Sequence, residues 1–395
     1  QVNDSFTLRN LKQYFNAPSG FDIIVTNPPY KSLRKDRRHG VRSNEELEKK
    51  HSAYFSHGIF SLQQGNKNLY ELYVEAIITD WIKDGGVIGL LVPRSLLVSP
   101  SNNLIRERLV NNFDIGKVTS LEEGTVFFQS VGQAFSVFSA KQGKKTEHVA
   151  FGSLKPRSDI PEFGPDISIK RMNGVTGENS ILELSNEDLD FLESLIGVPS
   201  VSDSKDVVNM RGEYDISLDR HFLDIESGAY PLLFGKDIQK FATNQPSAWV
   251  KPEFIQRPKG SWVNEPRLAC QQISNMNSDI RLKWALVPAG TVLSNSCNFL
   301  SMSPSAESDT KLTSLYFYLG VLNSPTLNRR FKLTSKNNHV SNVEINNLPL
   351  GNPSGKMANE IIGLVKARIF ESKKIDLSHL DKLVLANFEV EGPSN

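Results

Sequence analysis

The chain has 395 residues, 39% of them hydrophobic and 23% charged, with a formal net charge of +1. This length predicts about two to three domains. The charge excludes a polycation, so a nucleic-acid partner would need a local basic face. Cys270 and Cys297 lack metal-ligand spacing, which excludes a disulfide framework or structural zinc site and fits a reducing cytoplasm. No apolar run reaches ~18 residues, so no membrane span is expected.

Strands and helices alternate along residues 1–145, the pattern of a parallel α/β sheet. The expected strands are FDIIVT (21–26), VIGLLVP (87–93), DIGKVTSL (114–121) and AFSVFSA (134–140). The first is apolar at Phe21, Ile23, Ile24 and Val25, as a strand buried on both faces should be. The expected helices are LYELYVEAIITDWIKDG, ended by Gly85 and Gly86, and SNNLIRERLVNNF, capped by Ser101.

The composition changes twice along the rest of the chain. Residues 146–199 are predicted to be a linker or crossover that carries one helix, at 185–197 with a serine cap and a glycine stop. Residues 200–395 are predicted to be a separate α+β domain. Short strands between Pro/Gly turns extend to about 300, and helical patterns follow in TSLYFYLGVLNS and GKMANEIIGLVKARIFESKK.

The strand at 21–26 ends in four unusual residues, Asn27, Pro28, Pro29 and Tyr30. The Asn27 side-chain oxygen and the Pro28 carbonyl offer two acceptors for the two N–H bonds of an amine. The prolines restrict φ and so hold the direction of that carbonyl. Tyr30 offers a flat face on which a base can stack. The plain alternative is a turn that ends a strand, because Asn and Pro favour turns.

With this motif the sequence resembles the adenine-N6 DNA methyltransferases of restriction-modification systems, which are bacterial or archaeal. The resemblance implies a partial Rossmann-like, S-adenosylmethionine-dependent methyltransferase sheet over residues 1–145. It also implies catalytic roles for Asn27, Pro28, Pro29 and Tyr30, with Asn27 near the cofactor, S-adenosylmethionine. The substrate would be an adenine flipped out of double-stranded DNA, because enzymes that act on a base must extract it from the stack.

Further matches implied by the resemblance lie on both sides of this motif. Asp4 stands where relatives carry the acid that binds the cofactor adenine, and Phe6 would lie against that ring. Phe127, with Phe128 as the adjacent alternative, would pack against the target base. The bland alternatives are an exposed turn carboxylate for Asp4 and a buried core residue for Phe127.

A basic loop directly follows Tyr30, at the edge where open α/β sheets bind ligands. Its cations are predicted to contact DNA phosphates: Lys31, Arg34, Lys35, Arg37 and Arg38. A solvated charged loop is the alternative.

Residues 200–395 resemble the target-recognition domain of these methyltransferases, through the ordered segments MRGEYD, YPLLFGKDIQKF, EPRLACQQIS and HVSNVEINNLPLG. The family's glycine-rich cofactor loop is not found before Asp4. The N-terminal part of the catalytic domain is therefore expected on another segment, and the 395 residues alone are expected to be inactive.

Three alternatives stay open at this point. One is a methyltransferase of the same chemistry that acts on a protein glutamine or on RNA. Another is a DNA specificity module without catalysis. An upstream endonuclease is a further possibility, although PDISIK (165–170) lacks the acidic residue that a nuclease signature has two positions before Lys170.

Overall fold

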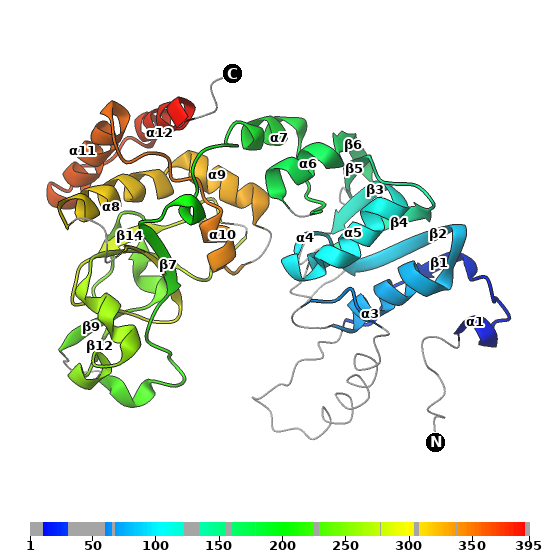
Figure 1. Ribbon diagram of the computed structural model, residues 1–395, viewed down its shortest axis with the longest axis horizontal. Coiled ribbons are helices and arrows are strands. Elements are labelled where there is room, and N and C mark those ends of the chain that lie inside the picture. Colours follow the sequence, from blue (N-terminus) through cyan, green and yellow to red (C-terminus); the bar gives the residue numbers. More distant parts are fainter. Residues whose placement is uncertain are drawn as a thin grey trace. The chain divides into compact units, whose positions relative to one another are not determined.

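The computed structural model describes residues 11–30, 60–64, 68–121, 134–154, 160–177, 179–224, 229–276, 278–303, 308–335 and 338–391. The chain divides into two compact units, Gln1–Glu193 and Ser194–Asn395 (Figure 1).

Unit 1 is built on one six-stranded sheet with the order β1-β2-β4-β3-β5-β6. Its strands are β1 (Phe21–Thr26), β2 (Ile82–Pro93), β3 (Phe113–Leu121), β4 (Phe135–Gln142), β5 (His148–Ser153) and β6 (Glu162–Ser168). Two neighbouring pairs are parallel, β1 with β2 and β3 with β5. The α/β fold class is confirmed, but the sheet is mixed and not parallel, because β4 inserts antiparallel between β2 and β3. Alternation of strands and helices along a sequence does not specify strand direction.

The helices of unit 1 include α1 (Leu11–Tyr14), α3 (Leu69–Ala76), α4 (Ser95–Val98) and α5 (Asn103–Asn112). The helix predicted to reach Gly85 stops earlier, in a π-helical turn over Ile77–Trp81. It stops there because Ile82 already pairs with Phe21 in the sheet. Ser101 is not the cap of α5; it lies in a 3₁₀ turn over Pro100–Asn102 that precedes this helix.

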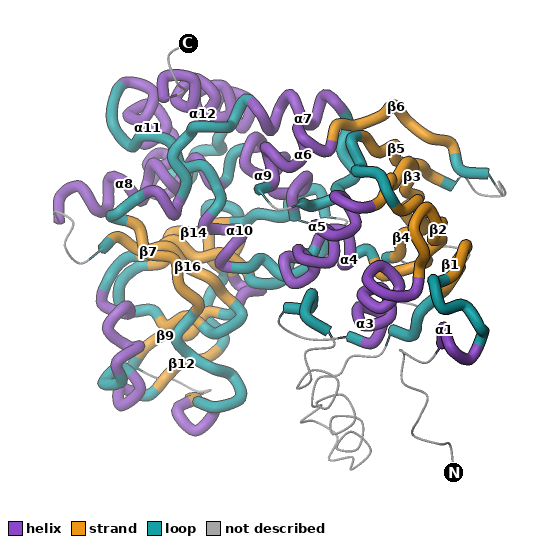
Figure 2. Tube along the Cα trace, turned by 45° about the vertical axis from the view of Figure 1, so that its right-hand side comes forward, coloured by secondary structure: helices purple, strands orange, loops and turns teal. Residues whose placement is uncertain are grey.

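The two faces of this sheet differ in burial near β1. Ile88, Leu90 and Val92 of β2 are buried, and Figure 2 shows α3, α4 and α5 on one side of the strands. On the opposite face the side chains of Ile23 and Val25 are 67% and 80% exposed. The prediction that β1 is buried on both faces is therefore wrong for the residues that the structure describes. The apolar composition predicted the strand correctly, but it did not predict which elements pack on each face of the strand.

Residues 146–193 belong to unit 1 and are not a linker. They contribute β5, β6, α6 (Ile169–Thr176) and α7 (Asn186–Glu193). The polar composition that suggested a linker belongs partly to β6, an edge strand that tolerates Pro165. The serine cap of the predicted helix is confirmed: Ser185 Oγ accepts from the Asp188 amide at 3.1 Å, and the helix ends before Gly197.

Unit 2 combines small sheets with helices, as predicted for an α+β region. One four-stranded sheet has the order β14-β13-β16-β7, from β14 (Trp284–Val287), β13 (Arg267–Gln271), β16 (Cys297–Met302) and β7 (Val207–Arg211). The other has the order β15-β9-β12-β8, from β15 (Val292–Leu293), β9 (Tyr230–Leu233), β12 (Ala248–Val250) and β8 (Leu223–Asp224). β10 (Ile238–Gln239) and β11 (Ala242–Thr243) form a hairpin.

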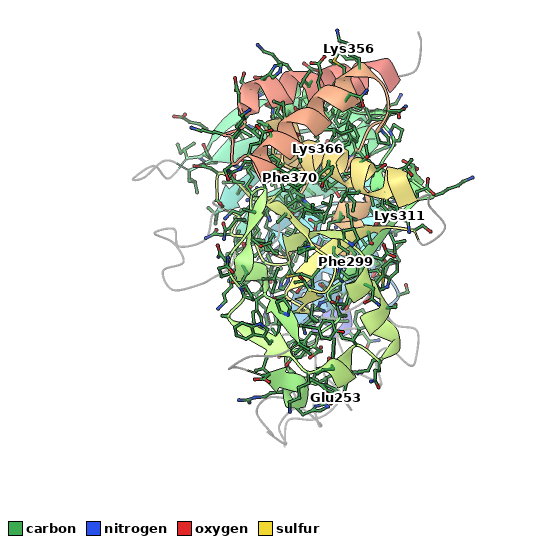
Figure 3. The ribbon with its side chains drawn as sticks, turned by 90° about the vertical axis from the view of Figure 1, so that its left-hand side faces the viewer. Glu253, Phe299, Lys311, Lys356, Lys366 and Phe370 are labelled. Carbon is green, nitrogen blue, oxygen red and sulfur yellow. The ribbon has the colours of Figure 1, made fainter. Side chains whose placement is uncertain are left out.

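Five helices follow the last strand among the residues of unit 2 that the structure describes. They are α8 (Ser308–Leu322), α9 (Pro325–Thr334), α10 (Asn342–Asn346), α11 (Lys356–Phe370) and α12 (Leu377–Glu391). In Figure 3, Lys356 marks the start of α11, and Lys366 and Phe370 lie toward its end. There Phe370 meets the ring of Tyr316 edge-on at 6.1 Å between centroids, and Lys366 Nζ lies 5.4 Å from the same ring.

Three of the four quoted segments of unit 2, MRGEYD, YPLLFGKDIQKF and EPRLACQQIS, meet at one place, around residues 291–297. Glu213 of MRGEYD binds the buried Arg267 of EPRLACQQIS and accepts from the Leu293 amide. A Cβ on Gly212 would lie 2.0 Å from the Ser294 carbonyl oxygen, and a Cβ on Gly235 of GKDI would lie 2.4 Å from the Ser296 oxygen. These segments therefore share a structural role, which is to let strands pack closely around this turn.

Candidate active site

Asn27 to Tyr30 lie at the carboxyl edge of the parallel pair β1–β2. Thr26, the last residue of β1, pairs with Leu90, and β2 continues to Pro93 beside the motif. Asn27 and Pro29 are exposed, whereas Pro28 is buried. The carboxyl ends of strands are where open α/β sheets bind ligands. Asn27 is thus exposed to solvent at the edge where sheets of this kind bind ligands.

Tyr30 turns back toward the sheet and connects the motif to β2 and β4. Its hydroxyl donates to the Leu91 carbonyl oxygen at 2.8 Å and also contacts Asn27 Oδ1. Its ring is half-buried and lies 5.2 Å from the ring of Phe135 and 6.2 Å from that of Tyr70, between centroids. Burial raises the pKa of Tyr30 to about 12. At neutral pH the hydroxyl therefore keeps its proton and acts as a donor.

A polar network around the Tyr70 hydroxyl supports this aromatic group. Tyr70, at the start of α3, has its hydroxyl 3.0 Å from Ser95 Oγ, and the Asn102 amide donates to the same hydroxyl at 3.4 Å. Asn102 also donates to the Ser95 carbonyl oxygen at 3.1 Å. Burial raises the pKa of Tyr70 well above its ordinary value, so this hydroxyl too stays protonated. The network fixes the residues that follow β2 relative to the start of α3.

Two buried glutamates of α3 hold the chain in front of that helix. Glu75 Oε1 accepts from the backbone amides of Ser61 and Leu62 at 2.6 and 3.0 Å. Glu71 accepts from the Asn68 amide at 3.0 Å, and its pKa is raised, chiefly by burial. These hydrogen bonds consequently anchor the start of α3, which carries Tyr70, to the residues that precede the helix.

The structure brings together only part of the predicted site. Asn27, Pro28, Pro29 and Tyr30 form one group, whereas Asp4, Phe6, Phe127 and Phe128 lie outside the described residues. The same holds for the predicted phosphate contacts Lys31, Arg34, Lys35, Arg37 and Arg38. Among the described residues, the rings that contact Tyr30 are those of Tyr70 and Phe135.

Sequence reasoning missed Tyr70, Ser95 and Phe135 as neighbours of the motif. One signal was available for Ser95, which follows VIGLLVP and so lies at the same sheet edge as Asn27. Phe135 pairs with Pro93 only because β4 runs antiparallel to β2. That direction carries no local signature, so Phe135 was not accessible from the sequence.

Metal and membrane features are absent from the described part of the chain. No three His, Cys, Asp or Glu side chains there are grouped so that they could hold a metal ion. No described helix is long and apolar enough to cross a bilayer.

Comparison with known proteins confirms the predicted resemblance to the DNA methyltransferases of restriction-modification systems. Residues 2–127 match the family model of the Eco57I restriction-modification methylases. The Type II methyltransferase M.BanIII of Aneurinibacillus aneurinilyticus is 26% identical over 186 residues, which are 46% of this chain and 30% of that protein.

Two solved structures are similar over most of the chain. The Type IIL restriction-modification enzyme MmeI in complex with DNA has a TM-score of 0.57 at 13% identity, covering 94% of this chain and 55% of that chain. The ATP-dependent Type ISP restriction-modification enzyme LlaBIII bound to DNA has a TM-score of 0.50 at 12% identity, covering 91% and 30%. At these identities the two structures show the shared fold, and the present chain spans about half or less of each of these relatives.

Proposed function

We propose that this chain is part of a site-specific DNA adenine-N6 methyltransferase of a Type II, IIG-like restriction-modification or phage-defence system. The observation that carries the proposal is the exposed Asn27 amide, presented by Pro28 and Pro29 at the carboxyl edge of β1 beside a half-buried tyrosine. The match of residues 2–127 to the Eco57I restriction-modification methylase model supports the proposed methyltransferase, and the proposed specificity for adenine rests on the motif from Asn27 to Tyr30.

The chemistry follows from what an exocyclic adenine amine needs. Its lone pair is delocalised into the ring, so the amine is a poor nucleophile. Acceptors at Asn27 Oδ1 and the Pro28 carbonyl would hold both N–H bonds and favour a pyramidal nitrogen with a usable lone pair. Bonding of the methyl group to this nitrogen would break the methyl–sulfur bond of the donor, leave a neutral thioether, and release one N–H proton to solvent. Such preorganised polar groups, aimed at developing charge, are worth most in a fixed site.

S-adenosylmethionine is the proposed cofactor, and it supplies an electrophilic methyl group on sulfur. The described residues fit this group at one point: Asn27 is exposed at the sheet edge where ligands bind. Asp4 and Phe6 are proposed to hold its adenosine. The rate would come chiefly from alignment of donor and amine.

Unit 2 is proposed to be the target-recognition domain that binds double-stranded DNA while the adenine is flipped out. The similarity to MmeI and LlaBIII, both solved with DNA, supports this proposal because it covers 94% and 91% of the chain and so includes most of unit 2. The loop cations from Lys31 to Arg38 are proposed to contact phosphates, and Phe127 the flipped base.

The test uses the longest natural form of the protein with labelled S-adenosylmethionine and unmethylated duplex DNA. The product nucleosides are identified by mass, and N6-methyladenine is the expected product. Label found in protein or RNA would overturn the DNA substrate. Absence of transfer with DNA binding retained would leave a specificity module without catalysis.

Tyr30 variants separate the ring from the hydroxyl. Tyr30→Ala should lower the methylation rate by about 5- to 150-fold, the equivalent of one lost base stack. Tyr30→Phe keeps the ring and releases Asn27 Oδ1 from the Tyr30 hydroxyl, so its rate should stay within about tenfold of wild type. Initial rates on one duplex measure both. Equal losses in the two variants would assign the effect to the hydroxyl.

We also infer that the exposed face of β1 and its neighbours is covered by a further segment of the methyltransferase domain. Ile23 pairs with Val87 and Leu91 with Val137, and Val25 lies 3.5 Å from the Cβ position of Gly89. Val87 and Val137 are 36% and 40% exposed, so these side chains add to the apolar surface of Ile23 and Val25. A contiguous apolar surface of this kind marks an interaction site.

The substitution Val25→Asp tests this inference. In the 395-residue chain the free energy of unfolding should change by no more than about 0.5 kcal/mol, because the position is exposed. In the longest natural form it should fall by about 1–3 kcal/mol or more, because a buried carboxylate would lack partners. Leu218→Asp, at an equally exposed leucine of unit 2, is the control for both forms. Equal small changes at both positions and in both forms would contradict the inference.

A further inference from the structure

Unit 2 carries a strip of two side chains, Arg211 and Gln272, beside the β14-β13-β16-β7 sheet. Arg211 is exposed, Gln272 is half-buried, and a hydrogen bond joins them. Arg211 ends β7, and Gln272 directly follows β13. Residues 338–340 run antiparallel to 272–274: Ile273 bridges His339, and the Ser274 and Val340 amides donate to the Asn338 and Gln272 carbonyl oxygens at 2.8 and 2.7 Å. The side chains therefore project from a backbone that is hydrogen-bonded throughout.

Arg211 is held in one orientation although it is exposed. Its Nε donates to the Asn295 carbonyl oxygen at 2.7 Å, and its Nη2 donates to Gln272 Oε1 at 3.1 Å. Both partners are neutral, and Arg211 forms no ion pair with any carboxylate of the described residues. The nearby Asp215 instead uses its Oδ1 for the Ser217 and Leu218 amides, at 2.9 and 3.1 Å. Asp215 lies near enough to interact with the Arg211 charge, but it makes no ion-pair contact with it. The guanidinium is therefore oriented by neutral acceptors, with no carboxylate of the described residues in contact.

A purely structural role accounts poorly for this arrangement. Hydrogen bonds at an exposed surface compete with water and contribute little to stability. Two other well-fixed arginines contrast with Arg211. Arg267 is buried with Glu213, and Arg257 is paired with Asp219. Of these three, Arg211 is the one that makes no ion-pair contact with a carboxylate of the described residues.

The side chains of the strip match the chemistry of base edges in the major groove. An arginine fork suits the O6 and N7 acceptors of guanine, the amides of glutamine and asparagine suit adenine, and an apolar side chain suits the thymine methyl group. Arg211 supplies the first kind and Gln272 the second.

From these observations we propose that Arg211 and Gln272 read bases of the recognised DNA sequence, with Arg211 directed at a guanine. The proposal rests on the proposed function in that it takes double-stranded DNA as the ligand of unit 2. It goes further by naming the side chains that set the recognised sequence. When a base edge binds, the Arg211–Gln272 hydrogen bond opens and each side chain exchanges this partner for the base.

The experiment uses the longest natural form and a library of duplexes with a randomised stretch. DNA retained by the protein and DNA methylated by it are sequenced separately, for wild type, Arg211→Ala, Arg211→Lys, Gln272→Ala and Arg108→Ala. Arg108 is an exposed arginine of α5 and serves as the matched control. Thermal unfolding of each variant confirms that it is folded.

In Arg211→Ala the preference at one defined position of the recognised sequence should fall by about 5- to 150-fold, with other positions unchanged. Arg211→Lys should lose most of the same preference, because an ammonium group lacks the two-pronged geometry of a guanidinium. Gln272→Ala should relax the same or the adjacent position, and Arg108→Ala should change none.

Two results would overturn the reading role. One is a uniform loss over all sequences in Arg211→Ala that Arg211→Lys restores, which assigns Arg211 to a phosphate. The other is an unchanged recognised sequence in all variants. If the wild-type protein retains a defined DNA sequence but methylates no DNA, the proposed catalysis is wrong and the proposed reading role of Arg211 and Gln272 is unaffected. A wild type that retains no defined sequence sinks the reading role itself.

Discussion

Asn27→Ala is expected to lower methyl transfer to DNA by about 10²- to 10³-fold, the usual cost of removing one preorganised polar group from a reaction centre. The reason is local. Asn27 is exposed at the end of β1, and its Oδ1 is the acceptor proposed for the amine. Among the described residues, the Asn27 side-chain amide makes no hydrogen bond to the backbone, so the variant should keep the fold. The measurement is the initial rate of label transfer at saturating DNA, together with the dissociation constant for the same duplex.

Asn27→Asp makes this test sharper. A carboxylate keeps an oxygen acceptor at the same place and removes the amide donor, so about a tenfold loss is expected, between wild type and alanine. Asn359→Ala, at an exposed asparagine of α11, should leave the rate unchanged. An Asn27→Ala enzyme that methylates at the wild-type rate would remove Asn27 from the reaction. Loss of DNA binding in the same variant would instead assign Asn27 to binding.

The part of the site that the sequence predicted is the part encoded by neighbours along the chain. Asn27, Pro28, Pro29 and Tyr30 follow one apolar strand, and the structure places them together at its carboxyl edge. Tyr70 and Phe135 complete the aromatic group around Tyr30, from α3 and from the start of β4. Their approach depends on how β4 pairs with β2, and long-range pairing has no local pattern.

The same distinction explains the errors in the fold. Strand and helix positions followed from hydrophobic periodicity, which is a local property. The linker prediction failed because β5 owes its place to pairing with β3 and β6, not to its own composition. Burial of β1 was overestimated because apolar composition favours a buried strand but does not show which part of the protein packs on each of its faces. The exposure of Ile23 and Val25 is visible only in three dimensions.

In unit 2 a contact that composition cannot show links two of the segments on which the resemblance to a target-recognition domain was based. MRGEYD and EPRLACQQIS were recognised by their order, but their physical link is the ion pair between Glu213 and Arg267. Arg267 Nη1 and Nη2 donate to the two Glu213 oxygens at 2.9 and 3.2 Å, and Nη2 also donates to the Thr291 carbonyl oxygen at 2.5 Å. The Arg267 guanidinium also lies 4.7 Å from the centre of the Phe299 ring, whose residue is labelled in Figure 3.

Breaking this pair should produce the largest stability effect of the single substitutions considered. Both side chains are buried, so Glu213→Ala would leave the Arg267 charge without its counter-ion and the Leu293 amide without its acceptor. A loss of about 3–5 kcal/mol in the free energy of unfolding is expected. Three of the four tryptophans, Trp249, Trp262 and Trp284, belong to unit 2, so urea unfolding followed by tryptophan fluorescence reports chiefly on this unit.

The double substitution Glu213→Leu with Arg267→Met separates the two sources of this loss. Removing both charges also removes the cost of burying them, so the double variant should be more stable than Glu213→Ala and close to wild type. Arg257→Ala, which removes a partly exposed partner of Asp219, should cost less than Glu213→Ala, because solvent screens that pair. A loss below about 1 kcal/mol in Glu213→Ala would mean that water reaches Arg267 and replaces the carboxylate. The segment 291–297 would then need another explanation for its close packing against Gly212 and Gly235.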